Sequence, residues 1–536
     1  MPDGTGTTIA IHSPRLHTGP SSFDRLVRFL DPDEFRAVCV IDCLCARLPP
    51  PNGPPVHGFL AEWLRTAARG DAALRHWVAE HFVASSLRAK AFDSARSLAD
   101  RYLKRGFWGA VWTPDGFAPG KIPECPPVLF GFGSLFPAPG WAAFFNSRKE
   151  RLPSPESTWL KAVRDLLPAV VSKGVGLASS LGTLTYDLAA AYAVRRSVPL
   201  LLVAAAGVEV SRKSMEAFAG SSHEGIGVAC MLSGHCGSKA RRMACRDRLL
   251  AMLSDLHVII QIRSGGNLLK TLLDQQYLQP RARWIVMPPA RQAANAGNFQ
   301  LAGECVHRVQ RISVAPPAPV AATGSPNRAG NRRRFLSRDL RRDDYVYHYT
   351  RSCPGPWPGQ SHGDYLRSLL ECAPGSGHSA LDTLSRILAE GRIRGSTRLV
   401  RGSDPVVSWS ARTPWELMSI RHWSRALIRW TFEPYGIAVR KTSVRNRGGK
   451  PAVYVAARFH QRLTREDRHR FQRHEPPSCA WKHEREWRTE GDFELAGLGE
   501  DEAFIFVPDS RDADTLQERV LSALPVLVPD AAPDPK

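Results

Sequence analysis

The stretch Gly174-Val175-Gly176-Leu177-Ala178-Ser179-Ser180-Leu181-Gly182-Thr183 decides the fold of this 536-residue chain, together with the segments on either side of it. It is a strand of small residues that ends in a polar, glycine-bearing loop. An apolar strand (141–145) and a helix (157–167) precede it, and a second helix (186–194) and strand (199–205) follow. Strands that alternate with helices predict an α/β fold with a doubly wound parallel sheet, in which ligands bind beyond the carboxyl ends of the strands.

The loops of this region favour an anionic ligand. Small side chains let backbone amides approach a phosphate closely, the following helix ends add a favourable dipole, and nearby arginines supply forked donors. The residues expected to bind phosphate are Ser147, Arg148, Ser179, Ser180, Gly182, Thr183, Arg246, Arg248, Ser264, Gly265 and Gly266. Glycines also serve ordinary tight turns, and that alternative stays open.

Several loops also resemble a known family in their order and spacing. They are Phe145-Asn146-Ser147-Arg148-Lys149, Gly176-Leu177-Ala178, Arg246-Asp247-Arg248-Leu249-Leu250, Leu253-Ser254-Asp255, Ser264-Gly265-Gly266-Asn267 and Val286-Met287-Pro288. Together they resemble the Rossmann domain of DNA-processing protein A (Smf), which belongs to the wider SLOG group of nucleotide-binding folds. The resemblance implies that the partner is a nucleotide-type ligand or single-stranded nucleic acid. The loop at 179–183 replaces the family's Gly-Ile-Asp and Ala-His motif and is closer to the phosphate-binding loops of other SLOG members.

Length and charge indicate the number of domains and the kind of partner. At ~100 to 200 residues per domain, the chain should hold about three domains. Its net charge of +21 favours a polyanionic partner or a phosphate-bearing ligand. A genome that encodes arginine freely would explain the same charge equally well.

Cysteine, histidine and hydropathy patterns indicate neither a metal site nor a membrane anchor. Cys39, Cys43 and Cys45 lack the paired spacing of a zinc site, and His76 and His81 lack a third ligand. The chain opens on a polar segment rather than a signal peptide, and no apolar run reaches the ~18 residues that span a bilayer. We therefore expect a cytoplasmic protein without membrane contact, and homo-oligomerisation is left open.

Composition divides the chain into four parts. We expect a helical N-terminal region (1–125), a Rossmann-like domain (126–292), a linker rich first in Pro and Gly and then in Arg (293–342), and an α+β domain (343–525). Strands expected in the last part cover 345–350, 405–410, 429–432, 436–440, 451–455 and 503–507, and helices cover 381–388 and 415–423.

The last part resembles a second family. Three segments are similar to bacterial proteins of unknown chemistry allied to abortive-infection proteins. They are the strand Tyr345-Val346-Tyr347-His348-Tyr349-Thr350, the Val-Ser-Trp-Ser segment at 407–410, and Trp481-Lys482-His483-Glu484-Arg485-Glu486-Trp487-Arg488. The opening strand also resembles ADP-ribosyltransferases. These resemblances imply an effector in antiphage defence, with NAD or another nucleotide as its cofactor if it is an enzyme.

Cleavage of a nicotinamide–ribose bond passes through an oxocarbenium-like state. It needs a group that orients the ribose, an aromatic surface and a carboxylate that stabilises positive charge. We assign His348, Tyr349 and Glu486 to these roles, with Ser410 as a neighbouring donor. Glu484 and Glu486 are expected to occupy alternate positions along a strand, and only one of them to face a given pocket. An ordinary hydrogen-bonded strand histidine is the alternative for His348.

Two hypotheses follow. In the first, the Rossmann-like domain binds a nucleotide-type ligand or nucleic acid and regulates a C-terminal effector. In the second, the chain is a non-enzymatic protein that binds single-stranded DNA in the manner of DNA-processing protein A.

Overall fold

A computed structural model describes most of the chain as two compact units. The described residues are 27–47, 76, 85–112, 128–133, 138–147, 153–154, 157–219, 225–230, 239–274, 280–288, 295–305, 309–314, 332–335, 344–373, 376–397, 400–401, 404–424, 429–476, 481–520 and 522–529. The N-terminal unit comprises residues 1–149, 156–317 and 366–371, and the C-terminal unit comprises 150–155, 318–365 and 372–536. The two units are described separately.

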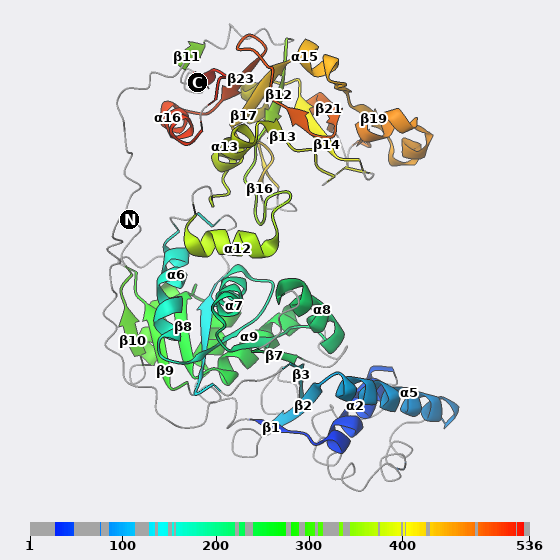
Figure 1. The fold of residues 1–536 in the computed structure, drawn as a ribbon, viewed down its shortest axis with the longest axis vertical. Helices are drawn as coiled ribbons and strands as arrows, with labels where there is room; N and C mark the ends of the chain where they lie inside the picture. The colour runs from blue at the N-terminus through cyan, green and yellow to red at the C-terminus, as the bar shows by residue number, and fades with distance from the viewer. Residues whose placement is uncertain are drawn as a thin grey trace. The chain divides into compact units, whose positions relative to one another are not determined.

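The described strands of the N-terminal unit form one ten-stranded sheet in the order β1-β2-β3-β7-β6-β5-β4-β8-β9-β10 (Figure 1). Every neighbouring pair from β7 to β10 is parallel, whereas β1, β2 and β3 extend the β7 edge in antiparallel fashion. The strands are β1 Val27–Phe29, β2 Phe107–Trp112, β3 Val128–Phe132, β4 Trp141–Asn146, β5 Gly176–Ser179, β6 Leu200–Val203, β7 Ile226–Cys230, β8 Leu256–Gln261, β9 Ala282–Val286 and β10 Val309–Ile312. The parallel core confirms the α/β class expected from the sequence.

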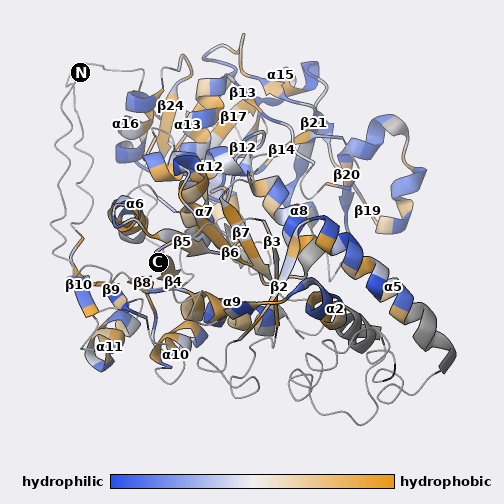
Figure 2. Ribbon diagram, turned by 60° about the horizontal axis from the view of Figure 1, so that its bottom comes forward, coloured by the Kyte–Doolittle hydropathy of each residue, from blue (hydrophilic) through white to orange (hydrophobic). Residues whose placement is uncertain are grey.

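Helices cover both faces of this parallel core. Figure 2 shows α6, α7 and α8 on one face and α9, α10 and α11 on the other. The helices of the unit are α2 Pro32–Arg47, α5 Ser85–Lys104, α6 Thr158–Val171, α7 Leu184–Arg196, α8 Val208–Ala219, α9 Lys239–Leu253, α10 Asn267–Leu273 and α11 Ala296–Glu304. Two layers of helices explain why the central strands are apolar throughout: β4 is buried along Trp141–Phe145 and β6 along its whole length.

The region expected to be helical over 1–125 also contains strands. Helices α2 and α5 pack together there, but β1 and β2 add to the sheet. Strand β2 reads Phe-Trp-Gly-Ala-Val-Trp, and its aromatic and β-branched residues suit a pleated surface. A helical pattern precedes this segment, but the segment itself is a strand that pairs with β3.

At the amino edge of the sheet, Asp255 ties two central strands together. This residue is fully buried, and its carboxylate accepts the Trp141 backbone N–H at 2.9 Å and pairs with Arg281 at 3.2 Å. The Leu253-Ser254-Asp255 landmark therefore holds the start of β4 beside β8. It lies at the end of the strands opposite to their carboxyl ends.

The C-terminal unit is built on an eight-stranded, mostly antiparallel sheet in the order β11-β24-β23-β17-β12-β14-β21-β18. Its strands are β11 Arg332–Phe335, β12 Tyr345–Tyr349, β14 Val406–Ser410, β17 Gly436–Arg440, β18 Lys450–Pro451, β21 Glu486–Glu490, β23 Ala503–Phe506 and β24 Val526–Pro529. One apolar cluster forms around Val346, Trp409 and Ile505, and a second around Tyr347, Tyr349 and Phe504. Because neighbouring residues of β12 belong to different clusters, each face of the sheet has its own core.

Short elements complete this unit. The helices are α12 His362–Glu371, α13 Ala380–Glu390, α14 Pro414–Met418, α15 Lys441–Asn446 and α16 Ser510–Arg519, of which α12 is divided between the two units. The 3-10 turns are η4 Ala457–Arg462, η5 Arg465–Arg470 and η6 Trp481–Glu484. Three short strand pairs are β13 Arg392–Ile393 with β22 Phe493–Glu494, β15 Trp423–Ser424 with β16 Arg429–Trp430, and β19 Val453–Val455 with β20 Phe471–Arg473. Helix α13 begins in a Ser379–Asp382 capping box and ends at Gly391 in the left-handed conformation.

Two expectations for this region were wrong. The helix expected over 415–423 ends at Met418, and the strand expected over 429–432 covers only Arg429–Trp430, which pairs with β15. Thr431 instead exchanges hydrogen bonds with His422, which closes the β15–β16 hairpin. Pro434, which has no N–H to donate, separates this hairpin from β17. Among the described helices, none has the length and apolar character needed to cross a bilayer.

Candidate functional site

The parallel sheet changes direction at β4. From β4 the chain winds through β5 and β6 to β7 on one side, and then returns to place β8, β9 and β10 on the other. The loops that follow β4, β5 and β8 therefore leave the sheet at one edge, next to the switch point where open α/β sheets bind ligands. We call this set of loops the rim: Asn146, Ser147, Ser180–Thr185 and Arg263–Gly266.

Hydrogen bonds join the three loops of the rim. The Asn146 side-chain amide donates to the Thr185 hydroxyl at 3.1 Å, which links the end of β4 to the start of α7. On the other side, the Arg263 backbone N–H donates to the Ser147 hydroxyl at 3.2 Å, which links β4 to the loop after β8. Ser147 thus lies at the rim, where its hydroxyl helps to position the loops.

Three polar atoms at or beside the rim are buried without a hydrogen-bond partner among the described residues. They are Asn146 Oδ1, Thr183 Oγ1 and Arg246 Nη1. Thr183 is the N-cap residue of α7, yet its side chain accepts no capping hydrogen bond. Buried polar atoms normally have partners, because leaving one unsatisfied costs about 1 to 3 kcal/mol. One acceptor, one hydroxyl and one cationic donor are therefore available to a bound molecule.

Arg246 is held beneath the rim by residues that the sequence analysis did not single out. Its guanidinium carbon lies 4.9 Å from the centre of the Tyr186 ring, and its Nη2 donates to Asp247 at 2.7 Å. The Tyr186 hydroxyl donates to the same carboxylate oxygen at 3.0 Å. Burial, together with the Asp247 carboxylate, raises the pKa of Tyr186 well above its usual value. Arg246 is only 3% exposed, and its Nη1 has no hydrogen-bond partner among the described residues, so the guanidinium is not an open fork.

The loop after β5 is partly occupied by the chain's own groups. The Ser179 hydroxyl donates to the Tyr186 carbonyl at 2.8 Å, and Ser180 is buried. Gly182 has a φ of 91°, which favours glycine, and its N–H donates to the Asp187 carboxylate at 2.8 Å. The Gly182 amide is therefore already used, contrary to its expected role in phosphate binding. The Thr183 hydroxyl of this loop is buried without a partner among the described residues.

The remaining predicted residues divide between the rim and other places. Ser264, Gly265 and Gly266 form an exposed turn that opens α10, with Gly265 at a φ of 69°. Arg248 instead pairs at 3.0 Å with Asp274, the C-cap residue of α10, at the opposite end of that helix. Its expected place at the rim was wrong, because its partner lies one helix length away. Arg148 lies outside the described residues.

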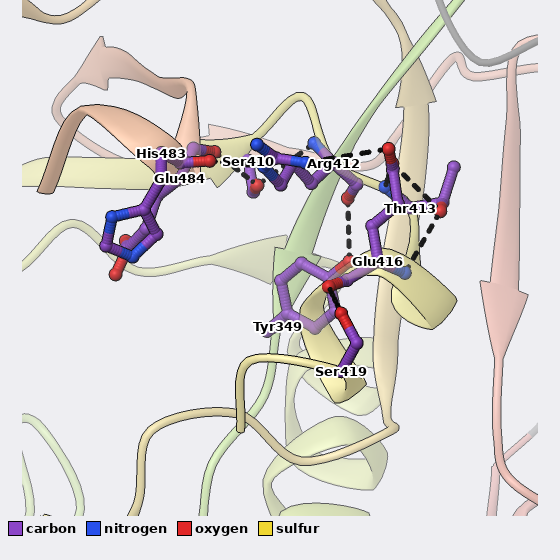
Figure 3. Close-up of polar contacts among 8 residues, drawn as sticks. All are labelled: Tyr349, Ser410, Arg412, Thr413, Glu416, Ser419, His483 and Glu484. Atoms are coloured by element: carbon purple, nitrogen blue, oxygen red, sulfur yellow. Dashed lines mark hydrogen bonds and ion pairs between the residues drawn. The ribbon is translucent and has the colours of Figure 1, made fainter. Parts of the chain in front are cut away.

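In the C-terminal unit, His348 and Tyr349 do not share a pocket. They are adjacent in β12, so their side chains point to opposite faces of the sheet. Tyr349 packs against Phe432 and Phe506, and its hydroxyl donates to the Arg412 carbonyl at 2.8 Å (Figure 3). Its expected role as a nicotinamide platform conflicts with this position in the core.

His348 is positioned by the neighbouring strand. Its Nδ1 lies 3.0 Å from the Ser408 carbonyl, and its ring packs edge-on against Trp409. Because a carbonyl only accepts, Nδ1 carries the proton and Nε2 is left as an acceptor. Burial lowers the pKa of His348 to about 4, and the hydrogen bond to Ser408 opposes this effect. The imidazole is therefore neutral at pH 7.

Ser410 and Glu486 do lie together, because they are paired across β14 and β21. The Ser410 hydroxyl donates to the Glu484 carbonyl at 2.7 Å and accepts the Arg412 N–H at 3.1 Å (Figure 3). Both contacts are to backbone groups. Ser410 thus fixes the turn that precedes β21 rather than presenting a free donor.

The expected alternation of Glu484 and Glu486 was wrong. Glu484 ends the 3-10 turn η6, and Arg485 adopts the left-handed conformation with a φ of 49° before β21 begins. Glu484 therefore precedes the strand, and its carboxyl group is close enough to that of Glu486 to interact with it. Burial, and then the neighbouring Glu486 carboxylate, raise the pKa of Glu484 to about 7, whereas Arg351 and Arg488 oppose the shift.

A buried arginine web fixes Glu486. Arg488 Nε donates to the Glu486 carboxylate at 2.8 Å, and its other nitrogens donate to the carbonyls of His469 and Phe471 and to Gln472. The Tyr454 hydroxyl accepts the Glu486 N–H at 2.7 Å. Both the backbone and the carboxylate of Glu486 are therefore held in place.

Arg351 is the cation that the sequence analysis missed. Its guanidinium carbon lies 5.5 Å from the centre of the Phe432 ring, and its Nε is buried with no hydrogen-bond partner among the described residues. Burial lowers the pKa of Arg351, and the carboxylates of Glu484, Glu486 and Glu433 oppose that shift. We call Arg351, Glu433, Glu484, Glu486 and Arg488 the carboxylate cluster. Its members come from segments far apart in the sequence, so no local motif contains Arg351 together with Glu486.

No three His, Cys, Asp or Glu side chains within the described ranges are arranged to hold a metal ion. Cys39 is a buried free thiol in α2, and His81 lies outside the described residues.

Comparisons with known proteins give weak structural matches to part of the chain. No protein-family model matches it, and no curated protein matches it. It is similar to DNA processing protein A from Helicobacter pylori, described for its unique single-stranded DNA binding mode, with 18% identity, a TM-score of 0.29, and coverage of 38% of this chain and 90% of that one. It is also similar to DNA processing protein A (DprA) from Streptococcus pneumoniae, with 15% identity, a TM-score of 0.31, and coverage of 52% and 89%.

Proposed function

We propose that the N-terminal unit binds a nucleotide-type ligand or single-stranded nucleic acid at the rim, and that this binding regulates the C-terminal unit. The observation that carries the proposal is the set of three buried polar atoms without partners, Asn146 Oδ1, Thr183 Oγ1 and Arg246 Nη1. They belong to the switch-point edge of a parallel sheet or to the helix beneath it. The loop order that resembles the DNA-processing protein A family supports the same class of ligand.

The chemistry of the three atoms suits a nucleotide. The Arg246 Nη1 donates to a phosphate or base oxygen, and the Asn146 Oδ1 accepts from a sugar hydroxyl or an exocyclic amine. The Thr183 hydroxyl does either. A purely anionic ligand would leave Asn146 Oδ1 unpaired, so a molecule with both donors and acceptors fits better than inorganic phosphate.

Calorimetric titration of the full chain tests this proposal. Mono-, di- and trinucleotides and a short single-stranded oligonucleotide are the ligands, and inorganic phosphate is the control. We expect at least one nucleotide ligand to bind and Thr183→Val to weaken its binding about tenfold, since a lost hydrogen bond to a charged group is worth about 1.5 to 3 kcal/mol. Arg511→Gln, an exposed change on α16, is the control variant. Binding that Thr183→Val leaves unchanged would refute the placement at the rim.

We further propose that the C-terminal unit is the effector and that it consumes NAD in antiphage defence. The carboxylate cluster supports this proposal. Arg488 holds the Glu486 carboxylate in place, and a fixed carboxylate suits a reaction with an oxocarbenium-like state. The neighbouring Glu484 has a pKa of about 7. Breaking the nicotinamide–ribose bond releases nicotinamide, while a water or acceptor oxygen bonds to the ribose carbon and loses a proton. The ionised form of Glu484 receives that proton, and Arg351 binds a phosphate oxygen.

Mass spectrometry of NAD incubated with the full chain tests the effector proposal. Turnover should disappear in Glu486→Gln and persist in Glu490→Gln, an exposed carboxylate on the same strand. Glu486→Gln should leave nucleotide binding at the rim unchanged. Absence of NAD turnover, with or without the rim ligand, would contradict this activity.

The alternative is a non-enzymatic protein that binds single-stranded DNA. It is favoured by the net charge of +21 and by the same loop resemblance. Under this alternative, the protein retards single-stranded DNA in gel electrophoresis, and both added salt and Arg148→Ala weaken that retardation. NAD turnover is then absent.

A further inference from the structure

A basic insertion stands between β18 and β21 in the C-terminal unit. Residues 452–476 leave the eight-stranded sheet, form the parallel pair β19 and β20, and carry the 3-10 turns η4 and η5 between these strands. Figure 1 shows this segment in orange beside β21. We call it the basic lobe.

The charge of the lobe is not balanced within it. It contains six arginines, three histidines and only three acidic residues. Asp467 pairs with Arg470, and Glu475 pairs with Arg473. Arg458, Arg462 and Arg468 are exposed, and the described part of the chain gives them no acidic partner within ion-pair distance.

Aromatic rings alternate with these cations. The guanidinium carbons of Arg458 and Arg462 lie 5.0 and 5.3 Å from the centre of the Phe459 ring. The Phe471 ring packs edge-on against His460, and Arg401 lies over it at 5.8 Å. Cations interleaved with rings and guanidinium planes suit single strands, whose phosphates and unstacked bases are both accessible. Reading the bases of a duplex commonly uses a helix or a strand ribbon in the major groove, and the described lobe presents short turns instead.

The lobe is firmly anchored beside the carboxylate cluster. Arg488 donates to the carbonyls of His469 and Phe471 and to the Gln472 side chain, and the same arginine holds Glu486. Tyr454 of β19 contacts the Glu486 backbone. The exposed cations are thus carried on a framework shared with Glu486.

We propose that the basic lobe is a second binding surface, separate from the rim, that binds the backbone of single-stranded nucleic acid next to the carboxylate cluster. Arg458, Arg462 and Arg468 contact phosphates, and bases stack on the exposed guanidinium planes of Arg458 and Arg462, which Phe459 supports. This proposal rests on the proposed function only for the class of ligand. The residues of the basic lobe belong to the C-terminal unit, whereas the rim belongs to the N-terminal unit.

Fluorescence anisotropy with a labelled oligothymidine, the full chain and a series of salt concentrations tests the lobe. We expect Arg458→Glu and Arg462→Glu each to weaken binding about three- to tenfold, whereas Arg511→Glu, the same charge reversal on exposed α16, has a smaller effect. The double variant should flatten the slope of log affinity against log salt by about 1.4, since each single-strand phosphate contact contributes about 0.7. Photocrosslinking of the wild type with a bromodeoxyuridine strand should label peptides within 452–476.

The outcomes separate the lobe from the rim. If Thr183→Val abolishes binding while the lobe variants match Arg511→Glu and crosslinks fall outside 452–476, the lobe proposal is overturned and the rim stands. If only the lobe variants lose binding and crosslinks lie in the lobe, the lobe is supported and the oligonucleotide does not use the rim. A wild type that binds no oligothymidine at low salt overturns the lobe proposal, and nucleotide titration still tests the rim independently.

Discussion

Two hydroxyl groups four positions apart in the sequence differ in their hydrogen bonding. The Ser179 hydroxyl is buried and donates to the Tyr186 carbonyl, whereas the Thr183 hydroxyl is buried without a partner. Arg246 and Arg248 differ in a similar way. Two residues apart on α9, they point about 200° apart around the helix, so one lies over Tyr186 and the other pairs with Asp274. The sequence places both arginines on one helix, but only the fold supplies their partners.

The two hydroxyls give a prediction for stability. Thr183→Val should leave the free energy of unfolding unchanged or raise it by up to about 1 kcal/mol, because it removes an unsatisfied polar group and no capping bond. Ser179→Ala should lower it by about 1 kcal/mol. Urea unfolding without ligand measures both. A Thr183→Val variant that is destabilised as much as Ser179→Ala would mean that this hydroxyl is a structural group.

Glu484 gives a prediction for pH dependence. Its pKa in the folded protein, about 7, lies above the ordinary 4.5, so the folded state holds the proton more tightly than the unfolded state. The stabilisation is therefore complete below about pH 4.5 and is lost as the pH rises towards 7 and beyond. Arg351, Arg488, Glu486 and Tyr454 surround this group.

Glu484→Gln stays neutral and should not show this loss. Between pH 5 and pH 8, the free energy of unfolding of the wild type should fall relative to Glu484→Gln by about 1 to 2 kcal/mol. Urea unfolding at both pH values measures the difference, with Glu490→Gln as the control. Parallel pH profiles for wild type and Glu484→Gln would rule out the raised pKa.

At the scale of elements, local and long-range order were not equally predictable. The strands β4, β5 and β6 and the helices between them follow apolar patterns that the sequence displays directly. The pairing of β3 with β7 joins segments about 100 residues apart, and no local pattern announces it. The turn at Arg485 was also hidden, because a residue other than glycine with positive φ is uncommon and arginine gives no signal for it.

Arg485 therefore offers a test of how the carboxylate cluster is built. Arg485→Val should lower the free energy of unfolding by about 1 to 2 kcal/mol, because a β-branched residue is strained at a φ of 49°. Arg485→Gly should be tolerated, since glycine adopts this conformation freely. The side chain is exposed, so lost packing does not confuse the comparison. Equal stabilities of the two variants in urea would contradict the left-handed turn.

At the scale of the whole molecule, each unit has its own hydrophobic core. One large cluster lies in the N-terminal unit around Phe145, Leu201 and Ile259, and two smaller clusters lie in the C-terminal unit. Independent cores predict more than one unfolding transition. Composition indicated several domains, but the strands that join the N-terminal segment to the Rossmann-like sheet could be found only in the fold.

Differential scanning calorimetry measures this independence. We expect two transitions, and a rim ligand at about 100 times its Kd should stabilise the N-terminal unit by about 2.7 kcal/mol. Glu484→Gln should move only the other transition. One cooperative transition that responds equally to both changes would contradict the division into separate cores.

Hydrogen–deuterium exchange on the full chain shows whether a nucleotide ligand binds at the rim. The nucleotide ligand that binds most tightly in the titrations is added at saturation, and exchange is compared with the free protein. We expect slower exchange in peptides that cover 141–147 and 180–187 and the middle of α9, where Arg246 lies. Protection confined to the amino edge of the sheet, near Asp255, or to peptides outside the N-terminal unit would contradict a ligand site at the rim.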